Sequence, residues 1–174
     1  LVSCFTGLTK LQIMEDVDGA IELANQRGME NVIIVPLTPG TLEEIDAYCD
    51  KYEPAAIIVD QMRNLVVKGD GRVSQLEAAA VGLRNIGKRR RIAVFSFTQA
   101  GDSAEGKAVL SMSDVDNSKT GIPGACDMLL GIGATLEQKD QGIRIITPIK
   151  NKSNNDHATF PLRLNPFLSR YINV

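Results

Sequence analysis

The segment Ala55-Ala56-Ile57-Ile58-Val59-Asp60 decides the fold of this chain. An uninterrupted apolar run rich in β-branched residues predicts a strand buried on both faces, as in a parallel sheet. An acid at the carboxyl end of such a strand lies where open α/β sheets bind their ligands. The alternative is a strand that ends in an ordinary turn-forming Asp, and the rest of the chain must decide between the two.

Helical and strand patterns alternate on both sides of this segment. We expect further strands at 1–5, 31–37, 92–98, 128–132 and 168–172, and an antiparallel pair at 142–149 and 158–164. We expect helices at 9–27 and 73–88, and a third that follows Thr41 and ends near Tyr52; Thr9 and Thr41 are the expected N-caps. Residues 100 to 125 have little periodicity, which predicts a long functional or mobile loop. This order predicts an α/β fold, with a mostly parallel sheet, helices on both faces and an antiparallel C-terminal hairpin.

Composition limits the class of protein. The chain has 174 residues, 44% of them apolar and 23% charged, with a net charge of −2. These values predict one ordinary globular domain without a generally basic nucleic-acid coat. No apolar run reaches the ~20 residues of a membrane span, and no signal peptide is visible. Cys4, Cys49 and Cys126 are widely spaced, which predicts buried thiols in a reducing compartment.

Two sequence features suggest functions that we do not favour. Gly101-Asp102-Ser103-Ala104-Glu105-Gly106-Lys107-Ala108 has the Gly-x-x-x-x-Gly-Lys spacing of a phosphate-binding loop, but Ala108 replaces the hydroxyl that ligates Mg²⁺. Asp102 and Glu105 would repel an anion, and no helix is expected to follow. The basic run 88–91 resembles a nucleic-acid patch, but cations at a helix C-terminus are the favoured interpretation.

Five motifs follow one another from residue 57 onward: I-I-V-D-Q-M-R-N-L, R-V-S-Q-L-E, R-I-A-V-F-S-F-T-Q, M-S-D-V-D-N-S-K-T-G-I-P-G-A-C-D-M-L-L-G and I-T-P-I-K-N-K-S-N-N. Their order resembles the RecA-like motor domain of DnaB-type replicative helicases, a group that includes phage primase-helicases. The resemblance covers about residues 31 to 174. It implies a RecA-like fold, with residues 1–174 as one domain. For the full-length protein, it implies an ATP-dependent DNA helicase that uses ATP and Mg²⁺.

The resemblance also implies roles for single residues. Asp60 would be the Walker B acid on the Mg²⁺ side of the nucleotide, and Gln99 would be the polar sensor of the γ-phosphate. Lys150 and Lys152, on the hairpin, would reach the nucleotide of a neighbouring subunit and offset transition-state charge. The alternatives are an ordinary loop glutamine and two lysines that serve solubility.

Further implications concern DNA and assembly. The loop 100–113 and the segment 114–121 would line the channel of a ring, with contacts to the single-stranded DNA backbone from Lys107, Asn117, Ser118 and Lys119. The alternative for these four is a role as solvated loop residues. The implied partners are further copies of the chain in a hexameric ring, single-stranded DNA and a primase. The implied location is the cytoplasm of a bacterium or of a phage-infected host.

The sequence departs from the family pattern at several positions. Lys152 stands where the family has an Arg, and a lysine cannot form a planar bidentate clamp. Asp116 also stands where the family has an Arg. If residues 1–5 are the family's second strand, Gly7-Leu8 occupies the place of the catalytic Glu. The chain contains no convincing Walker A motif, and it begins at Leu1 within an apolar stretch. We therefore expect a fragment truncated at its N-terminus and inactive alone. The rival hypothesis is a catalytically degenerate RecA-like module for assembly or single-stranded DNA binding.

Overall fold

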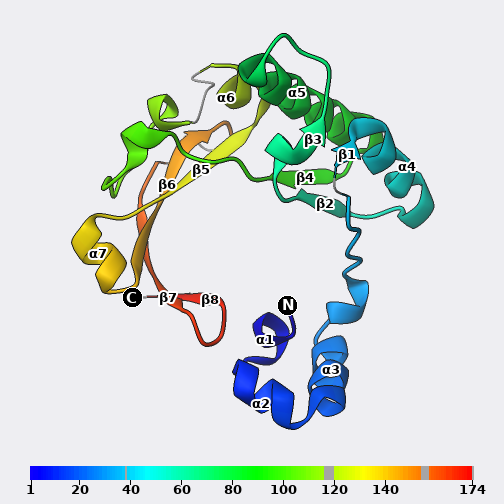
Figure 1. The fold of residues 1–174 in the computed structure, drawn as a ribbon, viewed down its shortest axis with the longest axis vertical. Helices are drawn as coiled ribbons and strands as arrows, with labels where there is room; N and C mark the ends of the chain where they lie inside the picture. The colour runs from blue at the N-terminus through cyan, green and yellow to red at the C-terminus, as the bar shows by residue number, and fades with distance from the viewer. Residues whose placement is uncertain (38, 116–119, 154–156, 174) are drawn as a thin grey trace.

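The computed structural model describes residues 1–37, 39–115, 120–153 and 157–173. The helices are α1 (Val2–Thr6), α2 (Lys10–Glu15), α3 (Val17–Gln26), α4 (Leu42–Tyr52), α5 (Arg72–Arg90), α6 (Gly121–Ala125) and α7 (Leu136–Asp140). The strands are β1 (Gly40–Thr41), β2 (Ala56–Val59), β3 (Leu65–Val66), β4 (Ala93–Ser96), β5 (Met128–Gly133), β6 (Ile143–Asn151), β7 (Phe160–Asn165) and β8 (Arg170–Asn173). Figure 1 shows them arranged as an arc, with α1–α3 at one end and β8 nearby.

Val2–Thr6 form the helix α1, which corrects the predicted strand at 1–5. Thr9 caps α2 as predicted, with its hydroxyl accepting from the Gln12 amide. The predicted helix at 9–27 is two helices, because the Asp16 side chain accepts from the Gly19 amide and begins α3 there. Arg170 Nε donates to the Cys4 carbonyl at 2.8 Å and joins these helices to the C-terminal strands.

The segment 31–37 forms no strand, so this prediction is wrong. Its first residue, Asn31, ends a 3₁₀ turn at Met29–Asn31. Val32, Ile33 and Ile34 are 43%, 56% and 74% exposed. A strand requires a neighbour for its backbone hydrogen bonds, and this segment pairs with no other part of the described chain.

The core forms between α5, α4 and one face of the parallel pair β2–β4. Thr41 and Glu44 form a capping box that starts α4, as predicted for Thr41. The buried residues of α5 are Leu76, Ala79, Ala80, Leu83 and Ile86. They pack with Ile45 and Cys49 of α4 and with Ile57, Val59 and Val94 of the strands. Figure 1 shows both helices on the same side of this pair.

The opposite face of β2 and β4 is exposed. The prediction that the Asp60 strand is buried on both faces is therefore wrong. Ile58 is 70% exposed and Phe95 is 57% exposed. Exposure alternates along β2, as it does in a strand with one covered face. No described element therefore covers this second, apolar face.

The C-terminal strands form an antiparallel sheet in the order β5-β6-β7-β8. The predicted pair is confirmed, with Ile143 opposite Arg163 and Ile146 opposite Phe160. The predicted closing strand is confirmed as β8. The mixed α/β class, with parallel strands and an antiparallel C-terminal hairpin, is therefore as predicted.

The basic run at the end of α5 binds α4. Arg90 Nη1 lies 2.6 Å from Asp50 Oδ1, and Arg90 Nε also donates to Asp46. Arg89 Nη2 lies 2.8 Å from Asp46 Oδ2. Hydrogen bonds from Arg90 and Arg89 lower the pKa of Asp46 to about 2. These contacts support a structural role for the run.

The replacement Asp46→Asn should change the pH dependence of stability. The pKa of Asp46 is lower in the folded chain than the ~3.9 of an unfolded Asp, so its stabilisation is present above ~4 and is lost as pH falls toward ~2. Urea denaturation should show the free energy of unfolding falling less steeply in this variant between about pH 5 and about pH 2 than in the wild type. Asp70→Asn, at an exposed loop carboxylate, is the control. Equal slopes for wild type and Asp46→Asn would contradict the account.

Candidate functional site

The ends of β2 and β4 bring two predicted site residues to the same edge. Val59 pairs with Ser96, and the Phe97 amide donates to the Val59 carbonyl at 3.1 Å. The Met62 amide donates back to the Phe97 carbonyl at 3.1 Å. Asp60 and Gln99 therefore follow neighbouring parallel strands, and both are exposed. This edge is where parallel sheets place their ligands.

Arg63 adds a cation that the sequence analysis missed. Its Nη1 donates to the side-chain oxygen of Gln99. Because an arginine can only donate, this contact occupies the amide oxygen and leaves the Gln99 amino group free to donate to another acceptor. The position of Arg63, three residues after Asp60, was the available signal.

The loop that follows Gln99 is closed around the carboxylate of Asp114, which is 2% exposed. Lys107 Nζ lies 2.8 Å from Oδ1, and Ser103 Oγ donates to the same oxygen at 3.0 Å. The Ser111 amide and hydroxyl donate to Oδ2 at 2.9 and 2.8 Å. These donors, Lys107 first among them, hold the pKa of Asp114 well below its usual range.

The backbone closes the same loop. Ala100 forms an antiparallel bridge with Val115, and the Gly101 amide donates to the Asp114 carbonyl at 2.8 Å. The segment 100–115 is therefore a folded unit attached directly to Gln99, without strands of its own. The end of the loop predicted at 100–125 is instead the helix α6.

The structure describes one of the four residues predicted to contact DNA. Lys107 Nζ is paired with Asp114, although the side chain is 48% exposed. The other three, Asn117, Ser118 and Lys119, lie outside the described residues, as does Asp116. The phosphate-loop spacing at 101–107 gains no support, because a short 3₁₀ turn follows Gly101 and the lysine already binds a carboxylate.

The hairpin lysines are bound by α6 and by the segment that joins α6 to β5. Lys150 Nζ donates to the Pro123 carbonyl of α6. Lys152 Nζ donates to Asp127 Oδ1 at 2.9 Å, and its amide donates to the Asp127 carbonyl at 3.1 Å. Lys152 is the main cause of the lowered pKa of Asp127. Within the chain, neither lysine contacts Asp60 or Gln99.

The donor set suits a Mg²⁺ ion that is held mainly by phosphates. Among the residues that the structure describes, no group of three or more His, Cys, Asp or Glu side chains could hold a metal ion. Asp60 is a single exposed carboxylate, and Mg²⁺ typically uses one or two carboxylates together with phosphate oxygens.

The described residues include no helix with the length and apolar character of a membrane span.

The parallel pair that is followed by Asp60 and Gln99, with α5 behind it and the antiparallel sheet after it, agrees with the predicted RecA-like fold. Solved structures confirm this fold over 100% of the chain. One is a DnaB-like replicative helicase described with its interactions with primase, at a TM-score of 0.82 and 13% identity. Another is the ATPase domain of G40P, at a TM-score of 0.81 and 14% identity.

The chain spans only part of these proteins, 46% of the first and 68% of the second. No family model matches the sequence, and no curated protein matches it. The likeness therefore establishes the fold, and the roles of single residues depend on the geometry of the site.

The replacement Asp114→Asn should open the loop 100–115. It removes the charge that four hydrogen bonds share, and hydrogen bonds to charged groups are the stronger ones. Amide hydrogen exchange of residues 101–115 should rise about tenfold or more, because local opening becomes easier. Asp102→Asn, at an exposed carboxylate in the same loop, is the matched control. Unchanged exchange in Asp114→Asn would show that the carboxylate does not close the loop.

Proposed function

We propose that this chain is part of the RecA-like ATPase domain of a DnaB-like replicative helicase. In the complete protein, ATP is hydrolysed between subunits of a ring, hexameric as in the family pattern, and drives translocation on single-stranded DNA. The observation that supports this most directly is the placement of Asp60 and Gln99 on neighbouring strand ends, in a fold that matches helicase ATPase domains throughout. Residues 1–174 then belong to one domain, which acts in the bacterial or phage-infected cytoplasm.

In this proposal Asp60 is the carboxylate on the Mg²⁺ side of the nucleotide. Mg²⁺, when bound, supplies positive charge to the phosphate oxygens. Gln99 donates from its free amino group to the γ-phosphate, with its orientation fixed by Arg63. The loop 100–115 starts at the next residue, so a shift of Gln99 passes directly to it.

In the same proposal, other residues contact the DNA and the nucleotide of the neighbouring subunit. Lys150 and Lys152 act on the nucleotide of the next subunit. The DNA backbone is contacted by Lys107, Asn117, Ser118 and Lys119. Lys107 makes this contact with the exposed part of its side chain, or it releases Asp114 and binds a DNA phosphate instead. A primase is a further proposed partner, by analogy with the helicase structure described with primase.

A further part of the protein supplies the phosphate-binding loop in this proposal. The strand β4 pairs only with β2 among the described strands, and β5 pairs only with β6. Ile58, Phe95 and Phe97 are at least half exposed on or next to the open pair. Exposed apolar faces of this kind mark contact surfaces, and the missing phosphate-binding segment is the occupant that we propose.

The rival function is a degenerate RecA-like module for assembly or single-stranded DNA binding. One observation favours it: Lys107 and Lys152 are each already paired with an acid of their own chain. Under this alternative, the full-length protein binds single-stranded DNA equally well with and without ATP.

The replacement Asp60→Asn tests the proposed function in the protein that includes the phosphate-binding segment. We expect ATP hydrolysis to fall by about 100-fold or more, because the Mg²⁺-side charge is lost. Nucleotide binding, measured separately, should be weakened less. Asp70→Asn is the matched control and should keep wild-type turnover. Wild-type turnover in Asp60→Asn would contradict the proposal, and the absence of any turnover in the intact protein would favour the rival.

A further inference from the structure

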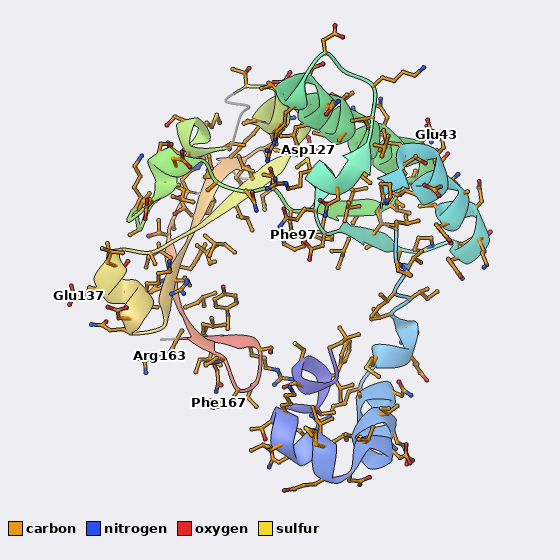
Figure 2. All side chains as sticks on the ribbon, in the orientation of Figure 1. Glu43, Phe97, Asp127, Glu137, Arg163 and Phe167 are labelled. Atoms are coloured by element: carbon orange, nitrogen blue, oxygen red, sulfur yellow. The ribbon has the colours of Figure 1, made fainter. Side chains whose placement is uncertain are left out.

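The carboxylate of Asp127 lies between cations from two different elements. Lys152, next after β6, donates to its Oδ1 at 2.9 Å, and Arg84 Nη2 of α5 lies 3.8 Å from the same oxygen. The Asp127 side chain is 70% exposed, so the cluster is open to the surroundings. Figure 2 labels Asp127 where α5 and β5 approach each other.

The cluster has more positive charge than its acid can neutralise. One carboxylate serves both Lys152 and Arg84, and Lys88, one turn after Arg84, also acts on it electrostatically. A surplus of cations remains, and it favours an anion that arrives from outside the chain.

The guanidinium of Arg84 has N–H donors that its contact with Asp127 does not use. Its Nη2 is too far from Asp127 for a direct hydrogen bond. Its Nε is buried and has no hydrogen-bond partner in the part of the chain that the structure describes. A donor without an acceptor is costly in a folded protein, so a small shift of the guanidinium that brings Nε to an incoming oxygen would be favoured.

The two cations complement each other chemically. A lysine is a point charge, whereas an arginine presents a planar fork that binds two oxygens of a phosphate. Lys152 also lines an open pocket of about 670 Å³ together with Lys150, Asn151 and His157. There is room beside it for an anionic group.

We propose that Arg84 and Lys152 together bind a phosphate of the nucleotide held by a second copy of this chain, and that Asp127 is the positioning residue that keeps them side by side. Arg84 then supplies the bidentate contact that Lys152 cannot make. This inference rests on the proposed ATPase function, and it adds to that function a cation from a helix outside the hairpin.

The first test measures ATP turnover of the complete protein. We expect Arg84→Gln to lower kcat about 10- to 100-fold with little change in KM, as for an interaction made mainly in the transition state. Arg84→Lys should restore only part of kcat, because the fork is missing. Arg91→Gln, at an exposed arginine just after α5, is the matched control. Wild-type kcat in Arg84→Gln, with Asp60→Asn still inactive, would overturn the inference and leave the proposed function intact.

Mixing two impaired variants tests whether Arg84 acts across the interface. In rings mixed from Asp60→Asn and Arg84→Gln subunits, some interfaces join an intact Asp60 to an intact Arg84. We expect the mixture to hydrolyse ATP faster than either variant does alone. No recovery, in rings shown to be mixed, would overturn the role in the second copy.

The positioning role of Asp127 is tested without any nucleotide. Acetylation of lysines, followed by mass spectrometry, reports how freely each amine reacts. We expect Asp127→Asn to raise the labelling of Lys152 about threefold or more relative to Lys139, an exposed lysine of α7, because the ion pair no longer holds it. Unchanged labelling would overturn the positioning role whatever the protein's activity. Raised labelling supports it even if Asp60→Asn shows the ATPase proposal to be wrong.

Discussion

The parallel pairing of β2 with β4 is the constraint on which the candidate site depends. Its register places Val59 opposite Ser96, and the backbone bonds that continue to Phe97 bring Asp60 and Gln99 to the same edge. A slip of one residue would turn every side chain of a strand to the other face. The core under α5 opposes such a slip, because only one register buries the apolar residues of β2 and β4 against Leu83 and its neighbours.

Local signals in the sequence predicted the elements that depend on local interactions. The caps at Thr9 and Thr41, the helix α5 and the apolar strand before Asp60 were all identified correctly. The segments 1–5 and 31–37 have the same apolar character as β2, but the first is largely helical and the second pairs with no described strand. Strand formation depends on a partner, and composition does not reveal whether a partner is present.

In the candidate site, too, the sequence predicted local features but not the contacts between distant residues. That Asp60 and Gln99 would lie at strand ends followed from the chain order. The partners of the cations did not: Asp114 binds a lysine 7 residues away, and Asp127 binds one 25 residues away, with no periodicity to indicate either pair. Two lysines predicted as free phosphate contacts are therefore held by acids of their own chain, which sets their positions and reduces their net charge. Arg84 was identified only through the contacts that the fold creates, and the same contacts show the role of Arg63, whose position near Asp60 was the one signal in the sequence.

We propose that Asp60 and Gln99 flank one metal-bound nucleotide. The most direct test replaces Mg²⁺ by Fe²⁺ in the complete protein with a non-hydrolysable ATP analogue, and maps where radicals formed at the metal cut the backbone. We expect cuts near residues 60–63 and 97–100 that disappear in Asp60→Asn. Cuts confined to residues 101–107, or cuts that Asp60→Asn leaves unchanged, would contradict the proposal.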